Sequence, residues 1–104
     1  MANTKVEIKV IAHPACEELY IVGSTNSLGA WNLSKAVKLE YCEACGKYTT
    51  AKMLPAGEVV EFKILSNKSW DCVEKGMFNE EISNHVIVPE KGLKVEIEVF
   101  NFAK

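Results

Sequence analysis

Hydrophobic and charged residues alternate with a period of two over much of this chain. In residues 5–12, KVEIKVIA, the apolar residues Val6, Ile8 and Val10 alternate with Lys and Glu. Successive side chains of a β-strand point to opposite faces, so the alternation predicts a strand with one buried face. The other segments with strand-like patterns are 19–23, 47–54, 58–65, 85–88 and 92–100.

The segment 58–65, EVVEFKIL, places a lysine on the polar side of an expected strand. Val60, Phe62 and Ile64 fall on one face, which we expect to be buried, and Lys63 falls on the other. Lys63 is therefore predicted to point away from the core, as a lysine of a binding site must.

Turn-forming residues separate the expected strands at short intervals. The segments STNSLG, CEACG, LPAG, SNKS and PEKG carry the Gly, Pro, Asn and Ser residues that favour turns. The one helix-like stretch, NLSKAVKL, is too short to be stable alone. This spacing predicts an all-β fold, a single antiparallel immunoglobulin-like β-sandwich of about seven to eight strands. With 104 residues, the chain has the length of one domain, covering 1–104.

Composition and charge narrow the classes of partner. Hydrophobic residues make up 48% of the chain, which is enough for a packed core. The formal net charge is −2 and all twelve basic residues are Lys, whereas nucleic-acid-binding domains carry basic patches rich in Arg. No apolar run approaches the roughly 20 residues that cross a membrane. We therefore expect neither a nucleic acid nor a membrane as partner.

The N-terminal residues, MANTKVEIKV, lack the apolar run of a signal peptide. If these residues begin the whole protein, we expect it to be cytoplasmic. If the domain is excised from a longer secreted protein, we expect it to be extracellular.

No set of residues typical of catalysis stands out. The two histidines, His13 and His85, have no Ser or Cys nearby in a nucleophile motif, and Asp71 is the single aspartate. The glycines are scattered and form no phosphate-binding loop. We therefore expect no enzyme activity and no cofactor.

Four cysteines, Cys16, Cys42, Cys45 and Cys72, allow several interpretations. Cys42 and Cys45 form a Cys-x-x-Cys motif, which could supply half of a zinc site or a redox pair. A zinc ribbon requires a second close pair, and a redox motif is expected to open a helix in a βαβ unit. Structurally passive thiols are the prediction, with a disulfide or a metal or redox module as the alternatives.

Two tryptophans lie in segments rich in turn residues. Trp31 lies in LGAWNLSKAVKL, and Trp70 follows SNKS. Both rings could fold back over an end of the sandwich as part of the core. Alternatively, each could offer a flat apolar face on which the C–H face of a sugar ring stacks, with Lys and Asn side chains hydrogen-bonding the sugar hydroxyls.

Four motifs in order resemble the family 20 carbohydrate-binding modules, the starch-binding domains. The segment LYIVGSTNSLGAWNLSKAVKL is similar to the entry segment of that family, and LPAGEVVEFKIL is similar to its L-P-A-G motif. The pair Trp70-Asp71 resembles the W-E pair that comes next, and FNEE resembles the closing N-R-x-Y. The segment DCVEKGMF makes the loop before this last motif longer than is usual in the family.

The resemblance implies a first carbohydrate site. Trp31 and Trp70 match two tryptophans that stack on neighbouring glucose units, and Lys63 matches a lysine that hydrogen-bonds sugar hydroxyls. Asp71 stands where the family usually has Glu, and Asn79 matches the asparagine of the site.

The resemblance also implies a possible second site, formed by Tyr20 and Tyr48, with Tyr41 as a nearby alternative to Tyr48. The expected function is non-catalytic binding of α-1,4-glucans such as starch, glycogen, maltooligosaccharides and cyclodextrins. The implied partners are the α-glucan polysaccharide and an amylolytic catalytic domain in a longer chain. The alternatives are an interaction sandwich that has lost sugar binding and the cysteine-based metal or redox module.

Overall fold

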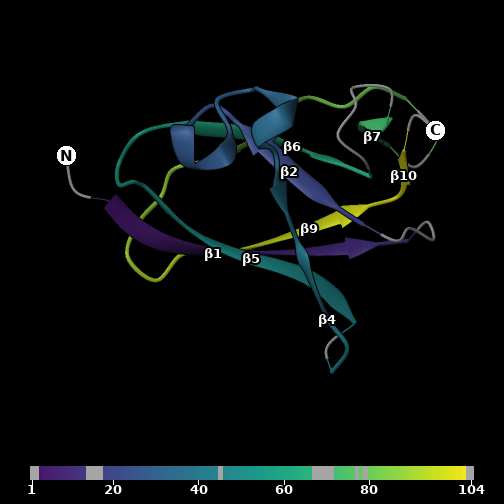
Figure 1. The fold of residues 1–104 in the computed structure, drawn as a ribbon, viewed down its shortest axis with the longest axis horizontal. Coiled ribbons are helices and arrows are strands. Elements are labelled where there is room, and N and C mark those ends of the chain that lie inside the picture. Colours follow the sequence, from purple (N-terminus) through teal and green to yellow (C-terminus); the bar gives the residue numbers. More distant parts are fainter. Residues whose placement is uncertain are drawn as a thin grey trace.

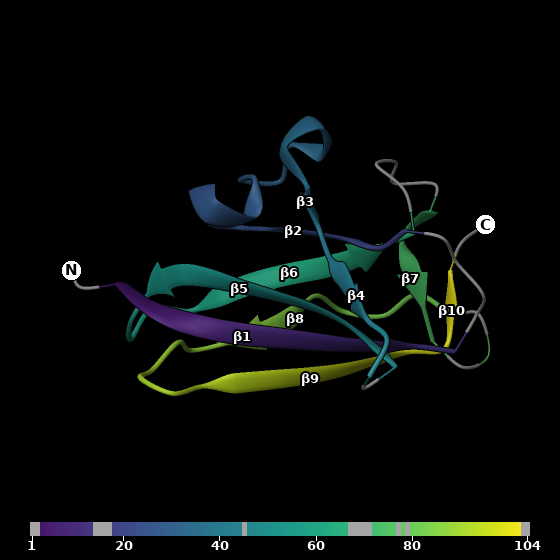
Figure 2. The ribbon, with the colours of Figure 1, turned by 60° about the horizontal axis from the view of Figure 1, so that its bottom comes forward.

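A computed structural model describes residues 3–13, 18–44, 46–66, 72–76, 78 and 80–102, and these form a β-sandwich (Figure 1). One sheet has the strand order β4–β5–β1–β9, and the other has the order β3–β2–β6–β8. A third sheet, at the end of the molecule near the C-terminus, pairs β7 with β10. Figure 2 shows the layered arrangement from the side.

The strands have the following bounds. The first sheet consists of β4 (Glu40–Cys42), β5 (Lys47–Pro55), β1 (Asn3–Ala12) and β9 (Lys94–Val99). The second consists of β3 (Val37–Lys38), β2 (Tyr20–Gly23), β6 (Val60–Leu65) and β8 (His85–Ile87). The small sheet joins β7 (Glu74–Lys75) to β10 (Asn101–Phe102).

The all-β sandwich expected from the sequence is confirmed, with two details that the periodicity did not predict. The described residues contain ten strands, more than the seven to eight expected. Five of them, β3, β4, β7, β8 and β10, are only two or three residues long, which is too short for an alternating pattern to reveal. Strands β1 and β9 pair in parallel, with Lys9 opposite Glu96, while the other strand pairs are antiparallel.

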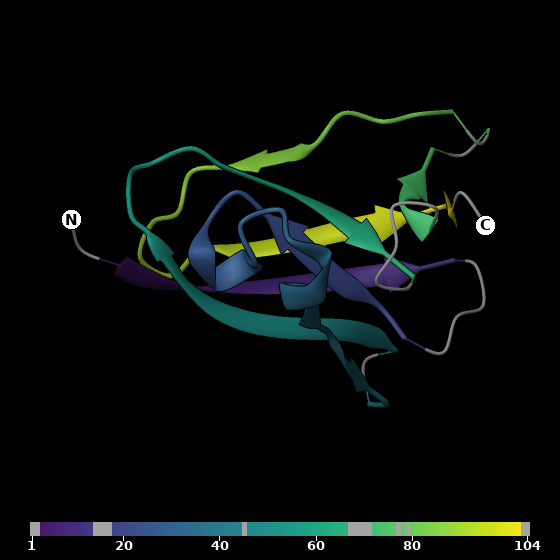
Figure 3. The ribbon, with the colours of Figure 1, turned by 45° about the horizontal axis from the view of Figure 1, so that its top comes forward.

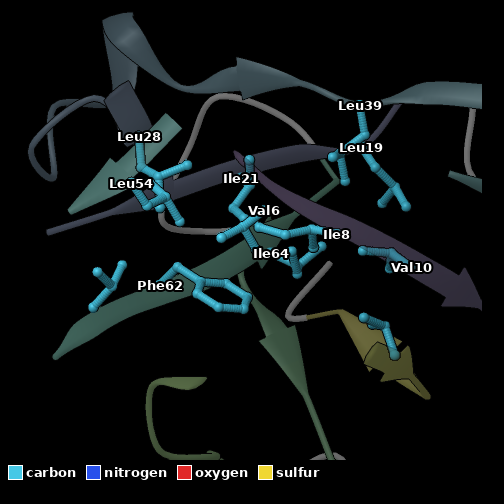
Figure 4. Packing of buried hydrophobic residues seen from close by; sticks show 12 residues of the cluster. Val6, Ile8, Val10, Leu19, Ile21, Leu28, Leu39, Leu54, Phe62 and Ile64 are labelled. Carbon is cyan, nitrogen blue, oxygen red and sulfur yellow. The ribbon is translucent and has the colours of Figure 1, made fainter. Parts of the chain in front are cut away.

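The core lies between the two large sheets. Figure 4 shows Val6 and Ile8 of β1 meeting Ile21 of β2 and Phe62 and Ile64 of β6. Each of these side chains is fully buried. Burying a side chain of this size contributes about 1.5–3 kcal/mol. The alternating pattern therefore predicted the inward faces of β1 and β6 correctly.

The connection from β2 to β3 folds back over the outer face of the second sheet. It contains two short 3-10 helices, η1 (Asn26–Leu28) and η2 (Leu33–Lys35), which Figures 2 and 3 show next to β2. Leu28 is fully buried and lies next to Leu54 (Figure 4). The Asn32 side chain caps η2 by accepting a hydrogen bond from the Ser34 N–H at 3.0 Å. The helix-like stretch is thus one short turn, followed by a strand.

Three consecutive residues between the two 3-10 helices have positive φ. These are Gly29 at 85°, Ala30 at 48° and Trp31 at 63°. A bulky side chain in the left-handed region is strained. Backbone hydrogen bonds hold the turn closed: Ala30 N–H donates to the Thr25 carbonyl at 2.8 Å, and Trp31 N–H donates to the Gly23 carbonyl at 2.9 Å. The local backbone therefore determines where Trp31 lies.

We expect Gly29→Ala to destabilise the protein more than Gly57→Ala. Both glycines have φ above 80°, and an L-residue in that region costs about 1–2 kcal/mol. A Cβ at Gly29 would also lie 2.8 Å from the Lys35 carbonyl oxygen, whereas one at Gly57 meets no described atom within 4 Å. Urea unfolding of the two variants measures the difference. Equal losses of stability would show that the contact with Lys35 is unimportant.

Candidate functional site

A pocket of about 380 Å³ opens on the outer face of the second sheet. Its walls come from the β2–β3 connection, from β6 and β7, and from the segment that leads into β8. The lining residues are Trp31, Lys63, Val73, Glu74, Lys75, Glu81, Ile82 and Asn84. Clefts of this size with a few convergent polar groups are typical of binding sites for small molecules or sugar units.

Trp31 combines the two roles that the sequence left open. Its side chain is half-buried and packs against a small apolar cluster on the outer face of the sheet, which contains Tyr20, Val22, Ala36 and Leu65. Trp31 also lines the pocket. Trp31 is therefore held by packing on one side and contributes to the pocket on the other.

Lys63 lies on the polar face of β6, as the alternation predicted. It pairs with Val22 of β2 in the antiparallel register. Its ammonium group donates a hydrogen bond to the main-chain carbonyl of Ile82. An ammonium group has three N–H donors, so two remain for other acceptors as far as the described residues are concerned.

The pocket lies where the strands beside β6 diverge. The pairing of β6 with β8 ends at Phe62–His85, and the next contact is an isolated bridge between Leu65 and Val73. At the gap, the N–H of Ile64 donates to Glu74 Oε1 at 2.9 Å. The Glu74 side chain thus takes the place that a strand would occupy.

Glu74 is a buried acid that the sequence did not single out. Its side chain is only 1% exposed, and His85 Nε2 lies 2.7 Å from its Oε1 atom. The His85 ring in turn packs against Phe62, with ring centroids 5.2 Å apart. The sequence of residues 73–75, VEK, did not predict that Glu74 is buried, because a charged residue in a short strand usually points to solvent.

The rim of the pocket is polar. Lys75 Nζ lies 3.7 Å from Glu81 Oε1, and because Glu81 is exposed this ion pair contributes little to stability. The Asn84 side chain donates to Glu61 Oε1 at 3.4 Å. The sequence analysis did not select Lys75, Glu81 or Asn84 as site residues. Asn84 could have been identified, because it is an amide residue directly before the expected strand that begins at His85.

Three residues of the expected first site, Trp70, Asp71 and Asn79, lie outside the described residues. The structure therefore brings together Trp31 and Lys63 from that set. The part played by the other three stays a prediction from the sequence.

The three tyrosines of the expected second site divide between two clusters. Tyr41 and Tyr48 pair across β4 and β5, with ring centroids 5.0 Å apart and planes inclined by 57°. Tyr41 is 55% exposed, and Tyr48 packs against the main core. Tyr20 instead belongs to the outer cluster that includes Trp31, and it is only 8% exposed.

The structure does not describe both cysteines of the Cys-x-x-Cys motif. Cys16 and Cys45 lie outside the described residues, and Cys42 and Cys72 are half-buried. Among the described residues, no three His, Cys, Asp or Glu side chains converge to hold a metal ion. Over the same residues, no helix has the length and apolar character needed to cross a membrane.

The residue pattern of the starch binding domain family matches residues 3–97. The α-amylase of Niallia circulans is 34% identical over 79 residues, which are 76% of this chain and 6% of that enzyme. Glucoamylase P of Amorphotheca resinae is 30% identical over 79 residues, which are 73% of this chain and 12% of that enzyme. The chain thus spans only a small part of the length of these curated relatives.

Solved structures share the fold. The glucoamylase of Hormoconis resinae superposes with a TM-score of 0.72 at 22% identity, over 96% of this chain and 18% of the glucoamylase. The family 20 module of the maltotetraose-forming amylase from Pseudomonas saccharophila STB07 has a TM-score of 0.68 at 19% identity, over 91% of this chain and 99% of the module.

The sandwich fold and the matched pattern define the class of this protein as a carbohydrate-binding module. Within that class, the chain belongs to the starch-binding domain family, the family 20 carbohydrate-binding modules. The resemblance inferred from the four motifs is confirmed. Carbohydrate binding is accordingly favoured over the interaction-domain and the metal or redox alternatives.

We expect Glu18→Gln to lower the pKa of Tyr20. A hydrogen bond of 2.7 Å from the Tyr20 hydroxyl to Glu18 Oε2, together with burial and the negative charge of Glu18, raises that pKa above its ordinary value of 10.0. The raised pKa favours the folded state below pH 10, and this contribution is lost as the pH rises through the pKa of the folded protein. Tyrosinate absorbance measures the shift, and Tyr20→Phe identifies the signal. An unchanged titration in Glu18→Gln would contradict the assignment.

Proposed function

We propose that this domain binds α-1,4-glucans, including starch, glycogen, maltooligosaccharides and cyclodextrins, at the pocket lined by Trp31 and Lys63. The Trp31 ring stacks on the apolar face of a glucose unit, and Lys63 donates to sugar hydroxyls. Trp70 is assigned as the second stacking residue on the basis of its sequence motif. Asp71 and Asn79 are assigned to the rim of the site on the same basis.

The observation that carries this proposal is that Trp31 and Lys63 line one pocket although they are far apart in the sequence. The polar atoms around the aromatic ring suit hydroxyl groups, which both donate and accept hydrogen bonds. Membership of the starch-binding domain family supports the same ligand class.

A shallow polar-rimmed site of this kind supports modest affinity. Two stacked sugar units and a few hydrogen bonds net about −4 to −7 kcal/mol, which corresponds to a Kd from roughly millimolar to about ten micromolar. Attachment to a polymer at this affinity suits a module that raises the local concentration of substrate for another domain.

We further propose that the domain itself has no catalytic activity and serves an amylolytic catalytic domain in a longer chain. The two curated relatives, an α-amylase and a glucoamylase, are far longer than the segment that matches this chain. A tethered module keeps such a domain on the polysaccharide through repeated weak contacts.

We expect Trp31→Ala and Lys63→Met to weaken α-glucan binding. Loss of a hydrogen bond from a charged donor costs about 1.5 kcal/mol, so Lys63→Met should weaken binding about tenfold. Trp31→Ala removes the stacking face and should abolish most retardation in native gels that contain amylose or glycogen. Trp70→Ala should have a similar effect on binding with little loss of stability.

The control variant is Met53→Ala, because Met53 is 51% exposed and does not line the pocket. It should migrate like the unmodified protein in every gel. Equal retardation of the unmodified protein by a cellulose derivative, or no retardation by amylose, would refute α-glucan binding. A large loss of stability in Trp70→Ala would instead identify that ring as part of the core.

We also propose a second sugar contact at the Tyr41–Tyr48 pair, whose exposed member offers an aromatic face. Two sites on one polymer bind more tightly than either alone. Tyr41→Ala should therefore reduce retardation by long amylose while leaving the affinity for maltose, followed by tryptophan fluorescence, unchanged. A parallel fall in both measurements would argue against a separate second contact.

A further inference from the structure

One oxygen of the buried Glu74 carboxylate has no hydrogen-bond partner among the described residues. Oε1 accepts from the Ile64 N–H, and Oε2 is buried with no such contact. Although His85 Nε2 lies 2.7 Å from Oε1, it too makes no hydrogen bond of good geometry within the described part of the chain. A buried polar atom without a partner is costly, and it commonly marks a position where a ligand or water binds.

The unpartnered oxygen belongs to a residue that lines the pocket. Lys63 precedes Ile64, the residue whose N–H donates to Glu74, and Lys63 also lines the pocket. Its ammonium group donates to the carbonyl of Ile82, another lining residue. The pocket therefore combines an acceptor at Glu74 with donors at Lys63, beside an aromatic face at Trp31. A hydroxyl group that donates to a carboxylate and accepts from an ammonium group complements this arrangement.

We propose that Glu74 is a sugar-binding residue that accepts a hydrogen bond from one hydroxyl of the glucose unit stacked on Trp31. This inference rests on the proposed function, and it adds a recognition element behind the stacking surface. The carboxylate is held in place by Ile64 and flanked by His85, so it is organised before the ligand arrives. Glu74 then makes the site selective for a glucan that presents a free hydroxyl at that position.

His85 provides a reporter that does not itself line the pocket. Its Nε2 atom faces the Glu74 carboxylate, so a new hydrogen bond to Glu74 should move its ring nitrogen resonance. His13, the other histidine of the chain, is the matched control, because it contacts Glu98 and stacks on Phe100 instead. In a titration of the unmodified protein with maltoheptaose, we expect the His85 signal to shift along the same binding curve as the tryptophan fluorescence, and the His13 signal to stay constant.

The second experiment compares Glu74→Gln with Glu90→Gln, because Glu90 is exposed and does not line the pocket. Glutamine keeps the shape and an oxygen for the Ile64 N–H, but it removes the charged acceptor. We expect Glu74→Gln to weaken maltose binding about tenfold and Glu90→Gln, which lies outside the pocket, to weaken it less than twofold. Both variants are tested with monodeoxy maltoses, each lacking one hydroxyl. One of these should bind the unmodified protein about tenfold more weakly than maltose does, and this difference should vanish in Glu74→Gln.

The outcomes distinguish a failure of the proposed glucan binding from a failure of the proposed role of Glu74. No binding by the unmodified protein refutes the proposed function itself. Binding without movement of the His85 resonance refutes the role of Glu74, and so does a Glu74→Gln variant that discriminates between the deoxy sugars as the unmodified protein does. The histidine titration needs no substitution, so it decides the question even if Glu74→Gln fails to fold.

Discussion

The antiparallel pairing of β2 with β6 supports both the core and the candidate site, because its two faces carry different side chains. Ile21 opposite Ile64 faces the sandwich interior, while Val22 opposite Lys63 faces outward. A slip of one residue in this register would bury Lys63 and expose the core residues. The packing that stabilises the sandwich therefore also determines which side of the sheet binds a ligand.

The site itself depends on two departures from regular structure. The left-handed turn at Gly29, Ala30 and Trp31 brings an aromatic ring back over the sheet. The divergence of β7 from β8 leaves an opening next to Lys63. Local strain of this kind persists only where surrounding contacts hold it, and here main-chain hydrogen bonds and the buried Leu28 do so.

The buried Glu74 links these features to the chemistry of the pocket. Its carboxylate completes the hydrogen bonding of β6 at Ile64 and contacts His85 on β8. An acid in this position costs stability unless its oxygens are satisfied. The same group that closes the gap in the sheet can therefore serve as an acceptor for a hydroxyl, which ties ligand recognition to the architecture of the domain.

The sequence by itself determined the all-β class, the inward faces of β1 and β6, the outward direction of Lys63 and, through four ordered motifs, the family. The all-β class and the directions of the side chains follow from alternation and local turn chemistry, which act over a few residues. The family follows instead from the resemblance of the four motifs. Only the tertiary structure decided that Glu74 is buried, that Asn84 and Lys75 reach the pocket, and that Trp31 is half-buried. Those outcomes depend on the point at which β6 stops pairing with β8 and instead contacts Val73. Such contacts between distant segments leave no periodic trace in the chain.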